Sequence, residues 1–248
     1  MKINVKDIHA LSLITNSFYD AFKVDFLYHS NALEGSTFTK ENLEKLLDEK
    51  KVVGEHFLDD VIETRISLYV FDKVIKDCDE KLDKFMLFDW QREQKRGSVD
   101  EEIHNTGCWK KYENRLRNID LKLAYPDEVD NLMFNLLADW NENPNPSIES
   151  IASFHSRFEK IHPFQDGNGR IGRFIILKQC IEKEIDLIAI DNKYEKEYKE
   201  ALYYAQKNND VSKLVEVFTN CQNRLDKKLS TYNNTLQLVK KEIATNNK

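Results

Sequence analysis

Glycine and proline are scarce in this 248-residue sequence, which contains only seven glycines and four prolines. A protein built from many β-strands needs frequent tight turns, and tight turns depend on these two residues. Their scarcity therefore favours an all-α fold. The length suffices for one or two domains with a sizeable hydrophobic core.

Long apolar runs and basic blocks are also missing. No apolar segment approaches the length of a membrane span, and the N-terminal segment lacks the uninterrupted apolar core of a signal peptide. The net charge is −6, and the sequence has no extended basic stretch that would displace counterions from a nucleic acid. We therefore expect a cytoplasmic protein that binds neither a membrane nor a nucleic acid.

Cysteines are few and lie far apart. The sequence contains four, without a CxxC pair: Cys78, Cys108, Cys180 and Cys221. This spacing predicts reduced thiols and argues against both a disulfide framework and a cysteine-based zinc site.

Apolar residues recur with helical spacing along most of the chain. Residues 8–35 predict one amphipathic helix that stops at Gly35, a residue suited to the position after a helix. Thr39 is placed to cap the next helix. Further helices are predicted over residues 56–75, 125–142, 147–162, 167–183, 194–207 and 211–225.

Two segments carry more specific expectations. In residues 56–75, Phe57, Ile66 and Tyr69 align with the other apolar residues and predict the apolar face of a helix. Residues 92–120 have poor helical periodicity and many polar residues, which predicts a loop with a short hairpin.

The segment from His162 to Arg173 reads HPFQDGNGRIGR and takes three of the seven glycines. Pro163 disfavours helical geometry at the residue before it, so the preceding helix should end at His162. A new helix follows the first two glycines. Its first turn offers unpaired backbone N–H groups and the positive end of the helix dipole, which together form an anion site.

The side chains around this turn suit phosphate chemistry. Arg170 and Arg173 are three residues apart, so they share one helix face and can grip phosphates with forked hydrogen bonds. Asp166 is a hard oxygen ligand suited to Mg²⁺. His162 carries an imidazole that can accept a proton from an attacking hydroxyl. Together these residues predict phosphoryl or nucleotidyl transfer.

The same twelve residues resemble the signature of the Fic family, HxFx(D/E)GNGRxxR, and match it at every specified position. The similarity extends over residues 26–225. It implies a Fic fold, a multi-helix bundle around a central helix–loop–helix, with a small β-hairpin flap near Gly107–Asn118. It also implies three regions: an N-terminal helical region over residues 1–50, a catalytic core over 51–225 and a C-terminal helical tail over 226–248.

Enzymes of this family transfer AMP from ATP to a protein hydroxyl with Mg²⁺ or Mn²⁺ and release pyrophosphate. By position, the resemblance implies that His162 is the base that deprotonates a Ser, Thr or Tyr of the target. It makes Asp166 the metal ligand and Phe164 a packing residue that anchors the loop. Gln206 falls where the family often places an amide near the adenine.

The resemblance also assigns the residues that would hold the triphosphate. Gly167, Asn168 and Gly169 match the anion hole for the α- and β-phosphates. Arg170 and Arg173 match the residues that hold the β- and γ-phosphates.

A second short motif lies earlier in the chain. Residues 30–35 read SNALEG and resemble the family's inhibitory motif (S/T)xxxE(G/N), with Ser30, Glu34 and Gly35 at its specified positions. A Glu34 carboxylate paired with Arg173 would fill the space and charge of a γ-phosphate. The resemblance therefore implies an enzyme restrained by its own N-terminal helix.

Other interpretations stay open at this point. His162 could be an ordinary capping histidine, and Glu34 a plain helix-end charge. His155, Glu159 and His162 share a helix face on which a metal site is conceivable, although His155 is better interpreted as a structural hydrogen-bonding residue.

Rival functions use the same site. They are the removal of AMP from a protein, another nucleotidyl or phosphoryl transfer, and a non-catalytic role as a nucleotide-sensing regulatory module. The sequence does not identify the target protein. Self-modification and a homo-oligomer stay open as well.

Overall fold

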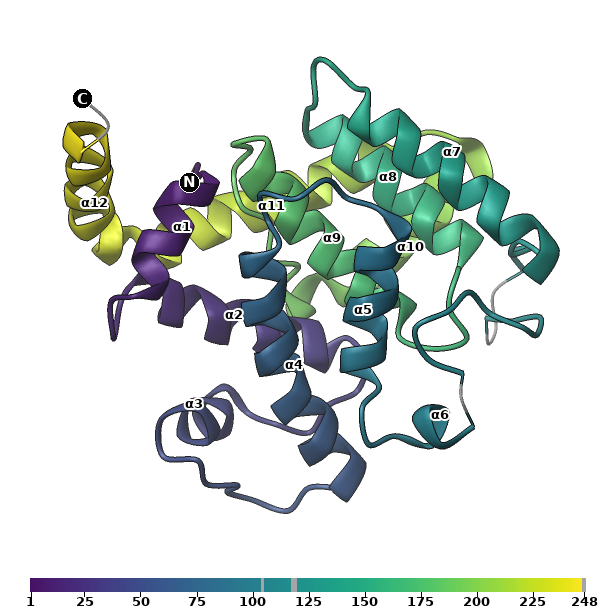
Figure 1. Cartoon of the computed structure of the whole chain (residues 1–248), viewed down its shortest axis with the longest axis horizontal. Coiled ribbons are helices and arrows are strands. Elements are labelled where there is room, and N and C mark those ends of the chain that lie inside the picture. The colour runs from purple at the N-terminus through teal and green to yellow at the C-terminus, as the bar shows by residue number, and fades with distance from the viewer. Residues whose placement is uncertain (104, 117–119, 247–248) are drawn as a thin grey trace. The chain divides into compact units, whose positions relative to one another are not determined.

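The computed structural model describes residues 1–103, 105–116 and 120–246 (Figure 1). Every regular element in these residues is a helix, which confirms the all-α prediction. The chain forms two compact units. The first unit comprises residues 1–79, 177–192 and 219–248, and the second unit comprises residues 80–176 and 193–218.

The first unit is built on helices from both ends of the chain. Aromatic rings of α2 fill its core: Phe22 and Phe26 lie 5.9 Å and 5.6 Å from Phe71 of α4, measured between ring centroids. The helices that belong wholly to this unit are α1 (Val5–Ser12), α2 (Phe18–Ala32), α3 (Lys40–Asp48), α4 (Leu58–Lys76), η3 (Ser230–Tyr232) and α12 (Asn233–Asn246).

The single helix predicted over residues 8–35 is wrong, because α1 and α2 are separate helices. Ser17 caps α2: its hydroxyl accepts a hydrogen bond from the Tyr19 N–H, and Asp20 accepts one from the Ser17 N–H. Such a reciprocal cap starts a new helix even where the apolar spacing continues through it. The predicted stop at Gly35 is confirmed, since Gly35 has φ +91° and lies just beyond α2.

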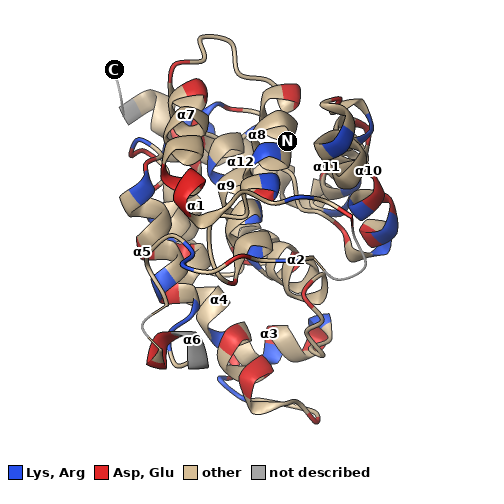
Figure 2. Cartoon of the chain, turned by 90° about the vertical axis from the view of Figure 1, so that its right-hand side faces the viewer, with Lys and Arg blue, Asp and Glu red and all other residues tan. Residues whose placement is uncertain are grey.

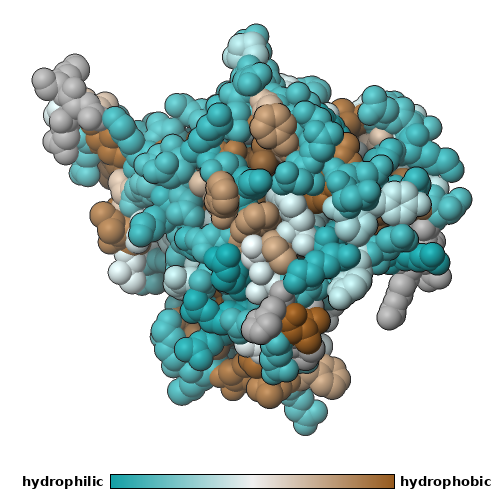
Figure 3. Space-filling model, turned by 45° about the vertical axis from the view of Figure 1, so that its right-hand side comes forward, coloured by the Kyte–Doolittle hydropathy of each residue, from teal (hydrophilic) through white to brown (hydrophobic). Residues whose placement is uncertain are grey.

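Two other local predictions have opposite outcomes. Thr39 caps α3 as expected, with its hydroxyl accepting the Asn42 N–H at 3.1 Å. The apolar face predicted for α4 is wrong: Phe57 is 79% and Tyr69 55% exposed. The residues that this helix buries are Thr64, Ser67, Val70, Phe71, Val74 and Ile75. Figure 3 shows brown, hydrophobic atoms over the lower part of the first unit, where α3 and α4 lie in Figure 1.

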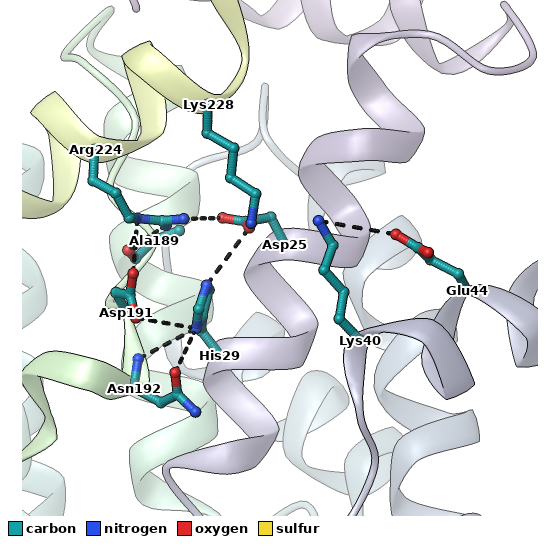
Figure 4. Close-up of polar contacts among 9 residues, drawn as sticks. All are labelled: Asp25, His29, Lys40, Glu44, Ala189, Asp191, Asn192, Arg224 and Lys228. Carbon is teal, nitrogen blue, oxygen red and sulfur yellow. Dashed lines mark hydrogen bonds and ion pairs between the residues drawn. The ribbon is translucent and has the colours of Figure 1, made fainter.

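A buried cluster of charges fixes α2 within the first unit (Figure 4). Asp25 of α2 is fully buried, and its carboxylate lies 2.8 Å from Nη1 of Arg224 and also binds Lys228. Arg224 reaches Asp191 as well, at 3.3 Å. His29 lies between the two carboxylates, 3.5 Å from each. The cluster therefore ties α2 to the segment around Asp191 and to the last turns of α11.

Burial alone would raise the pKa of the Asp25 carboxyl. The contacts with His29, Arg224 and Lys228 outweigh it and hold this pKa well below its usual range. Asp25 is therefore ionised at neutral pH. Its buried negative charge depends on the cationic partners of Asp25 for stabilisation.

Arg224→Ala should lower the free energy of unfolding by about 3 kcal/mol, because it removes a cation shared by two buried carboxylates. Urea titration followed by circular dichroism measures the change. Lys227→Ala, at an exposed position of the same helix, is the control and should change stability by less than about 0.5 kcal/mol. Equal effects of the two substitutions would contradict a stabilising cluster.

The second unit comprises residues 80–176 and 193–218. Helices α7 and α8 lie side by side, and α5 and α10 contact α7 and α8 respectively (Figure 1). Its helices are α5 (Lys84–Gln94), α6 (Val99–Glu102), η1 (Pro126–Glu128), α7 (Val129–Asn141), α8 (Ile148–Ile161) and α10 (Glu195–Asn208). Three elements have residues in both units: α9 (Asn168–Glu182), η2 (Asn192–Tyr194) and α11 (Ser212–Lys228).

The loop predicted over residues 92–120 begins later than expected, since α5 continues to Gln94 and α6 interrupts it. Its described residues form no β-strand. Residues 117–119, which include Asn118 of the expected hairpin, lie outside the described residues.

Two observations concern the distribution of charge and of long apolar helices. Basic and acidic residues are interspersed along α10 (Figure 2). Within the residues that the structure describes, no helix combines the length and the apolar character needed to cross a bilayer.

Candidate active site

His162 lies at the end of α8, as Pro163 led us to expect. Helix α8 stops at Ile161, and His162 takes a left-handed conformation with φ 52° and ψ 61°. Its N–H still donates to the carbonyl of Phe158 at 2.8 Å. The chain then turns over six residues before α9 begins at Asn168.

Asn168 closes this turn with its side chain. Its amide oxygen accepts the N–H of Phe164 and its amide nitrogen donates to the carbonyl of Phe164, both at 2.8 Å. Phe164 is fully buried, with ring centroids 5.4 Å from Trp109 and 6.5 Å from Phe88. The side-chain amide of Asn168 and the packed ring of Phe164 thus fix the loop.

The backbone at the start of α9 has the geometry of an anion site. Gly167 has φ +86°, and its carbonyl accepts the N–H of Ile171 at 3.0 Å. The first-turn N–H groups of an α-helix lack intrahelical acceptors, and here they belong to Asn168, Gly169 and Arg170. A Cβ at position 167 would lie 3.0 Å from Oε1 of Gln94, so both the space and the backbone conformation favour glycine.

Asp166 lies beside this helix start and is held by cations. Its Oδ2 is 2.5 Å from Nζ of Lys95 and 3.8 Å from Nη2 of Arg170. Partial burial would raise the pKa of this carboxyl, but Lys95, Arg170 and the Gly167 N–H outweigh it and lower the pKa. Asp166 is therefore ionised at neutral pH.

The same carboxylate fits a magnesium ion that arrives with phosphates. Mg²⁺ usually binds one or two carboxylates and keeps its other positions for water and phosphate oxygens. The Asp166 side chain is 54% exposed, so it can meet such an ion. The described residues contain no group of three or more His, Cys, Asp or Glu side chains suited to a metal. Asp166 would thus be a single protein ligand.

Arg170 and Arg173 are both buried on α9, at 7% and 4% exposure. A buried guanidinium needs anionic or polar partners to offset its desolvation. Arg170 lies near Asp166, and the positive charge of Arg173 acts on His155 of α8. Two cations therefore lie on α9 directly after the turn that joins it to α8.

His155 is a structural hydrogen-bonding residue, as expected. Its Nε2 lies 2.7 Å from the hydroxyl of Tyr198 on α10. Burial, with a smaller contribution from Arg173, lowers the pKa of His155 to about 3. Glu159, one turn further along α8, has its Oε2 3.9 Å from Nδ1 of His162. His155 is therefore neutral in the folded protein, and Glu159 faces the imidazole of His162.

His155 should make the protein sensitive to acid. A histidine in an unfolded chain titrates near about 6.5, so between that pH and about 3 the unfolded chain binds one more proton than the folded one. The free energy of unfolding should fall as pH drops through this range, by about 1.4 kcal/mol per pH unit from this group. His155→Gln should remove that contribution in urea titrations at several pH values. Tyr198→Phe keeps the imidazole buried and should retain it, whereas equal slopes in the parent and His155→Gln would contradict the assignment.

Comparison with known proteins bears directly on this turn. Residues 81–180 match the Fic/DOC family. The match spans less than half of the chain. The matched residues include the turn between α8 and α9 and the helix α5 beneath it.

A stretch of 70 residues is 36% identical to a relative from Aquifex aeolicus (strain VF5) named "Probable protein adenylyltransferase". The stretch covers 27% of this chain and 22% of the relative, so the similarity spans less than a quarter of that protein.

Solved Fic structures share the fold. A Fic domain containing signaling protein from Bacteroides thetaiotaomicron is 22% identical, with a TM-score of 0.77 over 96% of this chain and 97% of that chain. A Fic family protein from Desulfovibrio desulfuricans is 22% identical, with a TM-score of 0.69 over 91% and 72%. Fic-1 (aa134–508) from C. elegans is 16% identical, with a TM-score of 0.69 over 93% and 67%. The predicted Fic fold is confirmed.

The segment expected to form the flap lies along the turn between α8 and α9. The N–H of Tyr112 donates to Oε1 of Gln165 at 3.2 Å. The side-chain amide of Asn114 donates to the carbonyls of Phe164 and Gln165, at 3.3 Å and 3.0 Å. Residues 105–116 therefore brace the turn with hydrogen bonds, without forming a strand.

Gln206 lies on α10 against α8. Its Nε2 reaches the carbonyl of Ser156 at 3.5 Å, and its own carbonyl accepts from Nζ of Lys160 at 2.8 Å. The contact with adenine stays a prediction.

The predicted inhibitory motif, residues 30–35, lies in the first unit. Ser30 is buried on α2, and Glu34 follows the helix end, with its N–H donating to the carbonyl of Asn31 at 3.0 Å. Arg173 belongs to the second unit. The pairing of Glu34 with Arg173 stays a prediction.

Sequence reasoning missed two residues that shape the candidate site. Lys95 is one, because its contact with Asp166 joins residues 71 positions apart. Gly172 is the other: a Cβ there would lie 2.6 Å from Oε1 of Glu159 and 3.0 Å from His155. A glycine inside an apolar helix was the available signal, since it weakens a helix unless something needs the space.

Proposed function

We propose that this protein transfers AMP from ATP to a Ser, Thr or Tyr hydroxyl of a protein and releases pyrophosphate. One observation carries the proposal: His162 stands at a fixed helix end across a closed turn from an anion-binding helix start. Two buried arginines and an ionised aspartate lie on that same turn and helix. The similarity to the adenylyltransferase relative supports the nucleotide and the class of transfer.

In the proposed reaction the target hydroxyl oxygen bonds to the α-phosphorus of ATP. The bond from that phosphorus to the oxygen shared with the β-phosphate breaks, and pyrophosphate leaves with its electrons. The hydroxyl proton passes to the imidazole of His162. Nδ1 faces Glu159, so we assign the proton to Nε2.

The other residues bind and orient the nucleotide in this proposal. The N–H groups of Gly167, Asn168 and Gly169 hold the α- and β-phosphates, and Arg170 and Arg173 hold the β- and γ-phosphates. Asp166 would hold Mg²⁺ or Mn²⁺, which supplies positive charge to the phosphates when it is bound.

We further propose that the enzyme is autoinhibited. Glu34 would compete with the γ-phosphate for Arg173 and so keep ATP from seating with its α-phosphate toward the hydroxyl. The protein would work in the cytoplasm, which agrees with the four cysteines being free thiols.

Whole-protein mass spectrometry after incubation with ATP and Mg²⁺ tests the function. The parent protein and Glu34→Gly are each incubated alone and with a cell lysate as the source of targets, and parallel samples contain ATP labelled on the α- or the γ-phosphate. We expect a mass gain of one AMP and transfer of the α-label alone. Transfer of the γ-label would indicate phosphorylation, and loss of AMP from a modified target would indicate its removal. Nucleotide binding without any label transfer would favour a regulatory binding module.

A further inference from the structure

His162 needs support from outside its own helix. A left-handed backbone conformation is unfavourable for a residue with a Cβ, so the surroundings must hold it. The hydrogen bond from its N–H to Phe158 fixes only the side of His162 that faces α8. The carbonyl of Ile161 belongs to the peptide unit before His162, and that of Pro163 belongs to the unit that joins Pro163 to Phe164. Contacts to these two carbonyls would therefore hold the backbone on both sides of the dipeptide His162–Pro163.

One residue binds both of these carbonyls. Lys110 donates from Nζ to the carbonyl of Ile161 at 3.1 Å and from its backbone N–H to the carbonyl of Pro163 at 2.8 Å. Its two donors therefore hold the peptide unit before His162 and the unit that joins Pro163 to Phe164. The Ile161 carbonyl also belongs to the last turn of α8, where a cation is favourable.

The burial of Lys110 indicates that these contacts matter. Only 3% of the residue is exposed, although it lies in a connecting segment where a lysine normally extends into water. Burial lowers the pKa of Lys110 to about 8, against the opposite influence of Glu128 and Glu113. The next residue, Lys111, is exposed and provides a matched comparison.

We propose that Lys110 is a positioning residue that holds the imidazole of His162 in line for proton transfer by clamping the carbonyls of Ile161 and Pro163. It acts through the backbone of the catalytic turn and contacts neither the nucleotide nor the hydroxyl. The inference rests on the proposed role of His162 as the base.

The kinetic test uses the Glu34→Gly protein as parent, with Lys110→Met, Lys110→Arg and Lys111→Met added singly. Lys110→Met should lower kcat for AMP transfer by about 100-fold, because a displacement of about 1 Å costs that much, while KM for ATP changes by less than about threefold. Lys110→Arg retains a cationic donor and should recover kcat to within about tenfold of the parent. Lys111→Met should match the parent. A kcat for Lys110→Met equal to that of Lys111→Met would overturn the proposal.

A second measurement does not depend on activity. The protein contains six histidines, and the ring nitrogen signals of ¹⁵N-histidine-labelled protein are assigned to His162 with His162→Ala. Lys110→Met should shift or split the His162 signals alone, and Lys111→Met should leave them in place. If the Met variant does not fold, Lys110→Gln, whose shorter amide falls short of Ile161, should give the same shift. Unmoved His162 signals would overturn the positioning role, whereas a shift in a protein without AMP transfer would leave it standing and refute the proposed function.

Discussion

Replacing His162 with alanine should lower the rate of AMP transfer by about 10²–10⁴-fold, the range that a positioned general base contributes. The affinity for ATP should stay within a few-fold of the parent. The imidazole is assigned to the hydroxyl proton, whereas the phosphates are assigned to the N–H groups of α9 and to two arginines. Single-turnover kinetics measures the first quantity and isothermal titration calorimetry the second.

The control for this substitution tests whether the backbone of the turn is disturbed. His162→Asn retains a side chain that tolerates the left-handed conformation, so it should fold like the parent and still fail to accept the proton. Loss of ATP binding in both variants would mean that His162 maintains the turn instead of performing chemistry. Full activity in either variant would exclude it as the base.

Replacing Glu34 with glycine should raise AMP transfer by about 10- to 100-fold, the size of a typical coupling between two sites. Removing the carboxylate would release Arg173 for the γ-phosphate and let ATP seat with its α-phosphate toward the hydroxyl. The measurement is the initial rate of α-label transfer at saturating ATP, in the parent and in the variant.

Glu34→Gln distinguishes charge from shape, because it keeps the length of the side chain and removes the negative charge. It should be activated to an intermediate degree. Adding Arg173→Ala to Glu34→Gly should abolish the gain, since the released guanidinium is the group that benefits. Unchanged activity in Glu34→Gly would refute the proposed autoinhibition.

The parts of this fold that sequence reasoning predicted have causes within a few residues. Thr39 caps α3 through the N–H of Asn42, and Pro163 ends α8 at His162. The signature around Asp166 and Asn168 is also local, and it predicted the Fic fold. A short window of sequence contains everything that such features need.

The parts that sequence reasoning missed depend on neighbours far along the chain. Ser67 is buried on α4 while Phe57 is exposed, because Ser67 accepts a hydrogen bond from Asn31 of α2. Lys95 meets Asp166 and Lys110 meets Ile161 only once the second unit has folded. The break between α1 and α2 is different, since Ser17 and Asp20 signalled it locally and the continuing apolar spacing concealed it.

The pair of amide hydrogen bonds between Asn168 and Phe164 has a consequence for how quickly a ligand is captured. The two bonds close residues 164–168 into a ring. The turn that precedes α9 therefore has its shape before any ligand binds. The entropy of ordering those residues is lost when the chain folds, and an arriving anion does not have to supply it. Capture at this ring should accordingly proceed in a single kinetic phase whose rate rises linearly with ligand concentration.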